Sequence, residues 1–350
     1  MVNNATLNIN LNNLKNNYLE LKNIAKNSIT AAVIKANAYG LGVLEISKKL
    51  YEIGCKYFFV ATLDEGIEAR NHLPKDAKIY VFNGIFEGEE KEFYHHNLIP
   101  ILNDFYQLEI WANYTQKALQ KLNAALHFDT GMNRLGFNFY EAESISKNSY
   151  ISSLSIDFIM SHLACASDKN HSLNQTQLER FLQIKKIFPT QKFSLANSGG
   201  VINGEDFHFD ITRPGYNLYS KNVVTLKAKI IQIREILEDS FVGYNATHKI
   251  SKGSKIAVIP IGYADGYTRI LSNNFYGMIG DYKVPQIGII SMDSSIFDVS
   301  NVPENILQKY NEIVLLNDKI SVCEMASKAQ TIGYEILTKL GRRIEKTYVS

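Results

Sequence analysis

A lysine lies at the end of an apolar run near the beginning of the chain. Lys35 follows the run Ala31–Ile34 and precedes the segment Ala36–Gly40. One interpretation is a lysine that faces solvent after a strand. The other is chemical, because lysine forms Schiff bases and a desolvated site lowers its pKa enough to make the amine a nucleophile.

Polar side chains also follow two later apolar runs. Arg134 lies in the glycine-rich segment Asp129–Gly136, and His162 closes the run FIMSH. Arg134 is either a surface residue of a turn or a planar bidentate donor aimed at a carboxylate or phenolate. His162 is either a core histidine or a ring that faces a cofactor.

Two further segments combine small residues with hydroxyl groups. The first is Asn197-Ser198-Gly199-Gly200, and the second is Thr212-Arg213-Pro214-Gly215-Tyr216. A phosphate site needs such residues, because backbone N–H groups must approach the phosphate oxygens closely. Together these groups suit one phosphorylated, carbonyl-bearing cofactor and one amino-acid carboxylate.

The pattern of apolar runs indicates how these residues are positioned. Short runs alternate with amphipathic helical patterns, and each run lacks the alternation of a half-exposed strand. They begin at Ala31, Tyr57, Lys78, Leu98, Ala124, Ile156 and Phe193, with an eighth near Asp210. We predict an α/β fold with an N-terminal (β/α)₈ TIM-type barrel over residues 1–225, whose functional face is the C-terminal end of the strands. The pattern alone also allows an open doubly wound sheet.

After residue 225 the pattern changes to strand following strand, with glycine and proline between them. Residues 226–350 are therefore predicted to form a mostly-β domain, with helical periodicity returning only near CEMASKA and IGYEILTKL. The alternating run at residues 5–10 is a candidate strand for packing with this second domain.

Composition narrows the range of partners. The chain has 350 residues, with 37 Lys and Arg against 35 Asp and Glu, for a formal net charge of +2. We expect neither nucleic acid nor a membrane as a partner, because no strong field and no long apolar span are present. Without a recognisable secretory signal, the expected location is the cytoplasm. Cys55, Cys165 and Cys323 fit no metal-ligand spacing, and we expect no metal site.

The segment Val33–Gly42, VIKANAYGLG, closely resembles the pyridoxal-phosphate signature of alanine racemases, which are fold type III enzymes. The resemblance continues through DTGMNRLGF, SHLACASD, LANSGG, TRPGYNLYS, IPIGYADGY, SMDSSIFDV and TIGYEILTKLGRR. These motifs occur in the family's order and cover nearly the whole chain. The resemblance therefore implies an isomerase that interconverts L-alanine and D-alanine, with pyridoxal 5'-phosphate as its cofactor.

The resemblance also implies a role for each matching residue. Lys35 would hold the cofactor and act on one face of the substrate Cα, and Tyr244 from a second subunit would act on the other. Inversion requires such a pair of bases on opposite faces. The implied cofactor-binding residues are Lys35, Tyr39, His162, Asn197, Ser198, Arg213, Gly215, Tyr216 and Tyr334; the implied substrate-binding residues are Arg134, Met292, Asp293 and Tyr263. It further implies a homodimer with shared active sites that supplies D-alanine for peptidoglycan.

Three positions depart from the family pattern. His127 stands where many members have a carbamylated lysine, whose negative charge steadies the neighbouring arginine. We hypothesise an anion such as chloride beside Arg134 and His127; the alternative is that Asn133 or a water holds Arg134. Ser194 replaces a histidine that often backs Arg213. Asn245 replaces the glycine that usually follows the catalytic tyrosine.

Other functions remain compatible with the motifs. A racemase of serine or another amino acid and a barrel-type amino-acid decarboxylase are the alternatives among enzymes. A non-catalytic pyridoxal-phosphate carrier is the alternative from another class. Such carriers lack the β domain and its tyrosine, so Tyr244 and the segment after residue 225 favour an enzyme.

Overall fold

The computed structural model describes residues 4–350, which form two compact units. Unit 1 contains the described residues up to Leu14, Tyr39–Leu41 and Tyr219–Ser350. Unit 2 contains Lys15–Ala38 and Gly42–Leu218. The boundary predicted after residue 225 falls inside a strand of unit 1, β12 (Val224–Lys229).

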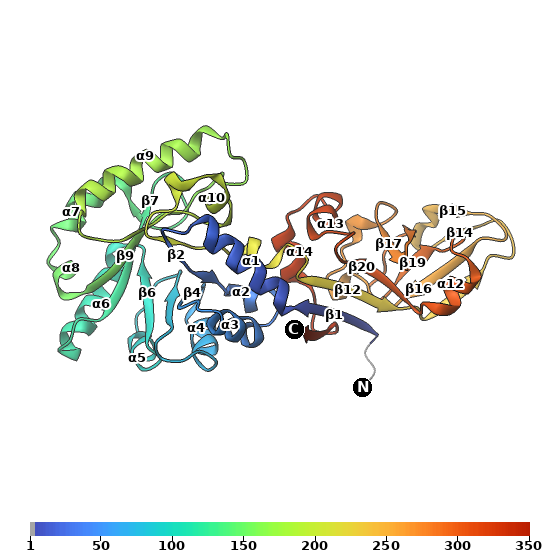
Figure 1. Ribbon diagram of the computed structural model, residues 1–350, viewed down its shortest axis with the longest axis horizontal. Helices are drawn as coiled ribbons and strands as arrows, with labels where there is room; N and C mark the ends of the chain where they lie inside the picture. Colours follow the sequence, from blue (N-terminus) through green and yellow to red (C-terminus); the bar gives the residue numbers. More distant parts are fainter. Residues whose placement is uncertain (1–3) are drawn as a thin grey trace. The chain divides into compact units, whose positions relative to one another are not determined.

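Unit 2 is built around a ring of eight parallel strand segments, so the predicted (β/α)₈ barrel is confirmed (Figure 1). The ring consists of β2 (Ile29–Thr30) continuing into β3 (Ala32–Val33), β4 (Tyr57–Val60), β5 (Lys78–Val81), β6 (Leu98–Leu102), β7 (Asn123–Asp129), β9 (Ser155–Met160), β10 (Phe193–Ser194) and β11 (Ile211–Thr212). A short strand, β8 (Phe137–Asn138), pairs with β7. β11 closes the ring by pairing with β2, while Arg213 N donates to Ala196 O beyond β10 (2.9 Å).

Helices cover the outside of these strands in Figure 1. Their bounds are α3 (Val43–Glu52), α4 (Leu63–Arg70), α5 (Glu90–His95), α6 (Phe105–Ala118), η1 (Phe139–Glu141), α7 (Ala142–Ser146), α8 (Ser149–Ser153), α9 (Ser172–Ile187), α10 (Ser198–Asn203) and η2 (Glu205–Phe207). Side chains cap the N-termini of α4 and α6: Thr62 accepts from Glu65 N, and Asp104 accepts from Gln107 N. Such N-caps satisfy backbone donors that the first helical turn leaves free. Two further helices, α1 (Leu11–Ile24) and α11 (Tyr216–Tyr219), include residues of both units.

Aromatic rings fill the interior of the barrel. The rings of Phe59 and Tyr80 stack with centroids 4.9 Å apart, and Phe158 meets Tyr80 edge-on at the same separation. The Tyr80 hydroxyl donates to Asp157 Oδ2 (2.8 Å), which also pairs with Lys78 Nζ (2.9 Å). This packing makes the barrel a filled core, so chemistry is confined to its ends.

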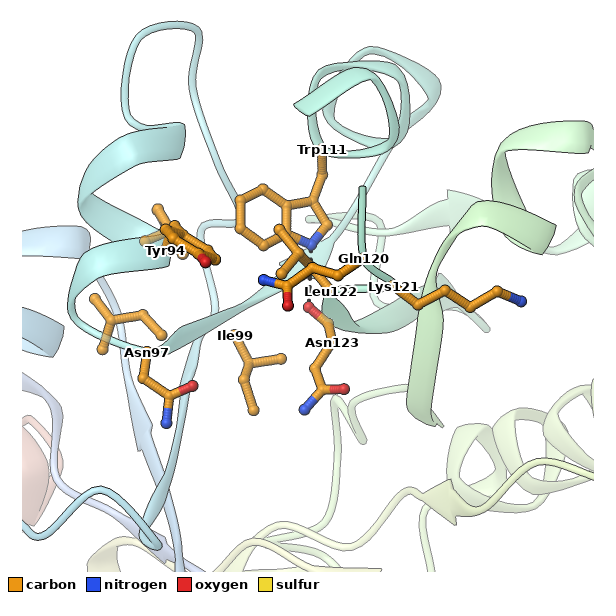
Figure 2. A pocket seen from close by; sticks show the side chains of 10 residues that line it. Tyr94, Asn97, Ile99, Trp111, Gln120, Lys121, Leu122 and Asn123 are labelled. Atoms are coloured by element: carbon orange, nitrogen blue, oxygen red, sulfur yellow. Dashed lines mark hydrogen bonds between the residues drawn. The ribbon is translucent and has the colours of Figure 1, made fainter. Parts of the chain in front are cut away.

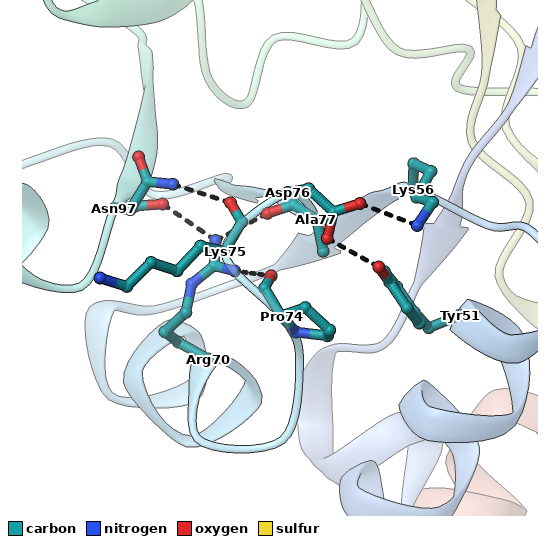
Figure 3. Close-up of polar contacts among 8 residues, drawn as sticks. All are labelled: Tyr51, Lys56, Arg70, Pro74, Lys75, Asp76, Ala77 and Asn97. Carbon is teal, nitrogen blue, oxygen red and sulfur yellow. Dashed lines mark hydrogen bonds and ion pairs between the residues drawn. The ribbon is translucent and has the colours of Figure 1, made fainter.

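Arg70 fastens the loops at the N-terminal end of the strands (Figure 3). Its guanidinium donates to carbonyl oxygens of Pro74, Ala77, His96 and Asn97. A cavity of about 170 Å³ lies at the same end, beside the first residues of β6 and β7 (Figure 2). Within the lining of this cavity, Trp111 Nε1 donates a hydrogen bond to Asn123 O (3.0 Å).

Unit 1 is a mostly-β unit, as predicted. Its nine-stranded sheet has the order β13-β16-β19-β18-β17-β20-β12-β1-β21. The bounds are β1 (Ala5–Asn10), β13 (Gln232–Glu235), β16 (Lys255–Ile259), β17 (Tyr276–Ile279), β18 (Tyr282–Ile287), β19 (Ser295–Asp298), β20 (Glu312–Leu316) and β21 (Glu345–Val349), with the pair β14 (Ser240–Val242) and β15 (His248–Ile250) alongside. The described part of this unit also contains α12 (Glu304–Lys309), α13 (Val322–Lys328) and α14 (Gly333–Lys339), and the short 3₁₀ helices η3 (Tyr244–Ala246), η4 (Tyr263–Asp265) and η5 (Arg269–Leu271). β1 pairs antiparallel with β12 and parallel with β21, beside β12 in Figure 1.

No helix within residues 4–350 is long and apolar enough to cross a membrane.

Candidate active site

A cavity of about 230 Å³ lies at the C-terminal end of the barrel strands. Its lining residues are Lys35, Ala61, Phe82, Asn83, His127, Arg134, Leu135, Met160 and His162. The structure therefore brings together Lys35, Arg134 and His162, which the sequence placed after three different strands. Burial lowers the pKa of the Lys35 amine, and the positive charge of Arg134 acts in the same direction. A lowered pKa increases the fraction of neutral, nucleophilic amine at neutral pH.

The backbone beyond Lys35 forms a left-handed turn, which the sequence did not predict. Ala36, Asn37 and Ala38 have φ values of 52°, 54° and 52°, and Tyr39 follows with 58°. L-residues disfavour this region by about 1–2 kcal/mol each. Contacts must compensate for that cost, and Glu65 on α4 supplies two: Oε1 accepts from Ala36 N (2.8 Å) and Oε2 accepts from Ala61 N (2.7 Å).

Replacing Glu65 with alanine is expected to lower the free energy of unfolding by about 1–3 kcal/mol, since two backbone donors lose a charged acceptor. Urea unfolding of Glu65→Ala measures the change. Glu65→Gln keeps one amide oxygen and should lose less. Glu68→Ala, an exposed change on the same helix, is the control. Equal stability of Glu65→Ala and Glu68→Ala would contradict a role for Glu65 in holding the turn.

The segment that carries Arg134 is folded by its own aspartate. Asp129 Oδ1 accepts hydrogen bonds from Gly131 N and Met132 N, both at 2.8 Å. Gly136 has φ 112°, and a Cβ there would lie 2.8 Å from Asp129 N. The glycine thus allows the segment to fold back closely on β7. The Arg134 side chain is exposed and lines the cavity.

Two histidines of the cavity are held uncharged. Burial lowers the pKa of His127 to about 3, and the positive charge of Arg213 contributes. Burial also lowers the pKa of His162, with Arg213, Arg134, His127 and Lys35 acting in the same direction. Both rings are therefore neutral at physiological pH, so His162 can pack against a flat ring without adding charge.

This burial predicts a loss of stability in acid. Both histidines take up a proton in the unfolded chain below their ordinary pKa of about 6.5, but not in the folded chain. His127 should therefore lower the free energy of unfolding by about 1.4 kcal/mol per pH unit as the pH falls below 6.5, and His162 should act in the same direction. Urea unfolding at pH 7 and pH 5 measures the slope. His127→Gln should remove about 2 kcal/mol of this pH dependence, and an unchanged slope would contradict the burial of a neutral His127.

Arg213 follows β11 and is almost fully buried. Its Nη1 donates to Ser194 Oγ, and its Nη2 donates to Ser161 O (2.7 Å). Ser194 Oγ in turn donates to Ile211 O (2.6 Å), so a serine at this position does provide a partner for the arginine. Arg213 Nε is buried and has no hydrogen-bond partner within residues 4–350. An orphaned donor of this kind fits an acceptor that a ligand would bring.

The two small-residue segments are joined by one hydroxyl. Ser198 Oγ accepts from Gly215 N (2.9 Å) and from Asn217 N (3.3 Å). Its own hydroxyl hydrogen remains available for an anion. Asn197 caps α10 by accepting from Gly200 N (3.0 Å), and Tyr216 begins α11. The predicted phosphate residues of unit 2 thus occupy neighbouring loops.

The other predicted residues belong to unit 1. Tyr39 is buried, and its ring lies 5.8 Å from that of Tyr334, centroid to centroid. Burial raises the pKa of both hydroxyl groups, so each is protonated and can donate. Tyr244 lies in the turn η3 (Tyr244–Ala246) with 66% of its surface exposed. Asn245 has φ 60°, a left-handed conformation that asparagine tolerates better than most residues, which explains how it replaces glycine.

Backbone hydrogen bonds and ion pairs hold the segments that carry Tyr263, Met292 and Asp293. Tyr263 N donates to Ser291 O (3.1 Å). Arg343 donates from Nη1 to Asp293 Oδ1 (2.6 Å). Arg343 also pairs through two nitrogens with the buried Asp265. This ion network fixes the Asp293 carboxylate.

Several residues of the site were missed by the sequence analysis. Glu65 is one, and Asn83, Asn103 and Gln107 are others around the cavity. Asn83 and Asn103 follow β5 and β6, so the rule that polar residues at strand ends form the site could have identified them. Glu65 and Gln107 lie on helices, and no local signal distinguishes them.

The residues present fit pyridoxal phosphate. The orphaned Arg213 Nε suits a pyridine nitrogen, the Lys35 amine suits an aldehyde, and Ser198 Oγ suits a phosphate oxygen. An arginine facing the pyridine nitrogen would keep it unprotonated, because a guanidinium group does not release its proton readily.

A (β/α)₈ barrel with a half-buried lysine at the C-terminal end of its strands, joined to a mostly-β unit, defines a class of lysine-based barrel enzymes. Comparison with known families agrees: residues 9–223 match the model of the alanine racemase N-terminal domain, and residues 223–348 match that of the C-terminal domain. The alanine racemase of Rickettsia africae is 42% identical over 99% of both chains. That of Rickettsia typhi is 36% identical, also over 99% of both.

Solved structures give the same result. Alanine racemase from Bartonella henselae, crystallised with covalently bound pyridoxal phosphate, has a TM-score of 0.93 at 34% identity and full coverage of both chains. Biosynthetic alanine racemase from Pseudomonas aeruginosa has a TM-score of 0.89 at 30% identity, again with full coverage. The chain belongs to the alanine racemase family.

Proposed function

We propose that this protein interconverts L-alanine and D-alanine, with pyridoxal phosphate held at Lys35. The observation that carries the proposal is the convergence of Lys35, Arg134 and His162 on one cavity in a member of this family. When bound, the cofactor withdraws electron density from the substrate Cα, which makes its hydrogen acidic enough to remove. A barrel site at the C-terminal strand ends is where this fold places its chemistry.

Two side chains move the proton. The Lys35 amine, whose pKa is lowered by burial, removes or returns it on one face of Cα. The hydroxyl of Tyr244 from a second copy does so on the opposite face. Removal on one face and delivery on the other inverts the centre, whereas delivery on the same face does not.

Other residues bind and orient. Arg134 would hold the substrate carboxylate, and Arg213 would donate from Nε to the cofactor ring. The residues that would hold the phosphate are Tyr39, Asn197, Ser198, Gly215, Tyr216 and Tyr334, and His162 would lie beside the ring. Met292, Asp293 and Tyr263 of the second copy bound the substrate pocket and limit its size.

The active unit is a homodimer, in which each copy completes the other's site. Exposed apolar side chains on unit 1 support this assembly, since a second copy could cover them. Leu237 is 78% exposed, and Phe241 and Met292 are more than half exposed, as is Tyr244. In a bacterial cytoplasm, the product D-alanine would serve peptidoglycan synthesis.

The test is to incubate purified protein and pyridoxal phosphate with L-alanine in heavy water and to follow optical activity and the Cα proton together. Loss of both signals is the expected result. Exchange without loss of optical activity would contradict the second base. No change in either signal, with turnover of serine or release of carbon dioxide from another amino acid, would favour one of the alternative activities.

A further inference from the structure

The hydrogen bonds of Asn103, next to the cavity, fix the direction of its side-chain amide. Asn103 Nδ2 lies within hydrogen-bond distance of three acceptors: Ile101 O (2.9 Å), Phe82 O (3.0 Å) and Gln107 Oε1 (3.2 Å). A reversed amide would direct its oxygen at three other oxygens. Asn103 Oδ1 must therefore be the atom that faces His127 Nδ1, 2.8 Å away.

Gln107 is fixed in the same way. Its Oε1 accepts from Asn103 N (2.9 Å), and its Nε2 donates to Asn83 O (2.9 Å). The amide lies directly on Gly84, where an added Cβ would come within 2.0 Å of Oε1. Any other residue at position 84 would displace it. The chain Gly84, Gln107, Asn103 and His127 is thus a rigid, buried relay.

The relay determines which nitrogen of His127 carries the proton. Because Asn103 Oδ1 can only accept, His127 Nδ1 must donate. Burial lowers the pKa of His127 to about 3, so the ring holds one proton and Nε2 is left with a lone pair. Nε2 has no hydrogen-bond partner within residues 4–350, and His127 lines the cavity.

Arg134 carries hydrogen-bond donors that could pair with the lone pair of His127 Nε2. It lines the same cavity and has no hydrogen bond or ion pair with any described residue. The cavity lining contains no carboxylate that could steady the guanidinium. Arg134 and His127 therefore face the same cavity of about 230 Å³.

We propose that His127 is a positioning residue: when the substrate binds, its Nε2 accepts a hydrogen bond from the Arg134 guanidinium, a bond that the structure itself does not make, and so aims the guanidinium at the substrate carboxylate. The uncharged imidazole then holds the guanidinium in place, and no bound anion is needed. The proposal disagrees with the chloride hypothesis above, because a lone pair at Nε2 repels an anion. The statement that Arg134 is aimed at the substrate carboxylate rests on the proposed function.

The tautomer can be tested without turnover. In the holoenzyme labelled with ¹⁵N-histidine, the His127 signal is assigned from its disappearance in His127→Gln. We expect a protonated Nδ1 and an unprotonated Nε2 at pH 7. A protonated Nε2 or a doubly protonated ring would overturn the proposal, whatever the enzyme does with alanine.

The positioning role is tested by kinetics. His127→Gln keeps an uncharged acceptor and should hold the KM for alanine within about threefold of the wild type. His127→Leu removes the acceptor and should raise KM about 10- to 100-fold, the value of a hydrogen bond to a charged group, with a smaller change in kcat. Circular dichroism verifies that both variants fold. Equal KM values for the two variants would overturn the role.

Replacing chloride distinguishes the proposed role of His127 from an anion bound beside Arg134. Replacing chloride with gluconate at constant ionic strength should leave the wild-type KM unchanged, and a rise in KM would overturn the proposal in favour of a bound anion. If the enzyme fails to turn over alanine but shows the expected His127 tautomer, the proposed function fails while the relay stands. Turnover with the opposite tautomer gives the reverse result.

Discussion

Tyr244→Phe is expected to lower the rate of alanine racemisation by about 10²- to 10⁴-fold, the contribution of one positioned acid–base group. The substitution keeps the ring and removes only the hydroxyl. Because Lys35 remains, the enantiomer whose Cα hydrogen faces Lys35 should still exchange with heavy water, so L-alanine and D-alanine are tested separately. Polarimetry and proton NMR on the same sample measure the two processes separately.

The matched control is Tyr282→Phe, a change at a partly exposed tyrosine of β18 in the same unit. It should leave racemisation unchanged, and neither variant should alter the cofactor content. Normal racemisation by Tyr244→Phe would show that another group acts on that face. Loss of exchange from both enantiomers would show that Lys35 does not remove the Cα hydrogen without the hydroxyl.

Lys35→Met should lose covalent attachment of the cofactor and lower racemisation by more than Tyr244→Phe does. Methionine preserves the length and apolar stem of the side chain, but it has no amine to attack an aldehyde or to take up a proton. Mass spectrometry after borohydride reduction detects the cofactor on the wild-type chain, and polarimetry measures the rate.

Lys56→Met is the control for this change. Lys56 is an exposed lysine of unit 2 that pairs with Asp76 (2.9 Å, Figure 3). It should leave both the attached mass and the rate as in the wild type. Cofactor mass on Lys35→Met after reduction would contradict the assignment of Lys35.

The sequence predicted the architecture because buried parallel strands and their helices leave a strong pattern. The left-handed turn after Lys35 and the strand β21 left no such pattern. The apolar run Ala31–Ile34 forms a strand only as far as Val33, since the left-handed turn beyond Lys35 contradicts the preferences of its own alanines. β21 was missed because Glu345–Val349 has no buried face to produce an apolar pattern.

The site was predictable to the extent that its residues follow strands. Lys35, Arg134 and His162 do, and the structure places them on one cavity. The support around them comes from distant parts of the chain and carries no local signature. Ser194 was recognisable only as a departure from the family pattern. The hydrogen bond that it accepts from Arg213 depends on β11 lying beside β10, where Asp210 N donates to Phe193 O.

The pairing of β1 with β12 and β21 affects the order of events during synthesis. Residues Ala5–Asn10 leave the ribosome about 214 residues before Val224 begins their first partner strand. At about 5–20 residues per second, the nascent strand waits roughly 10–40 s without its neighbours. The apolar residues of the strand alternate with Thr6, Asn8 and Asn10. One of its two faces is therefore polar while its edges are unpaired. Such a face resists premature pairing with other nascent chains.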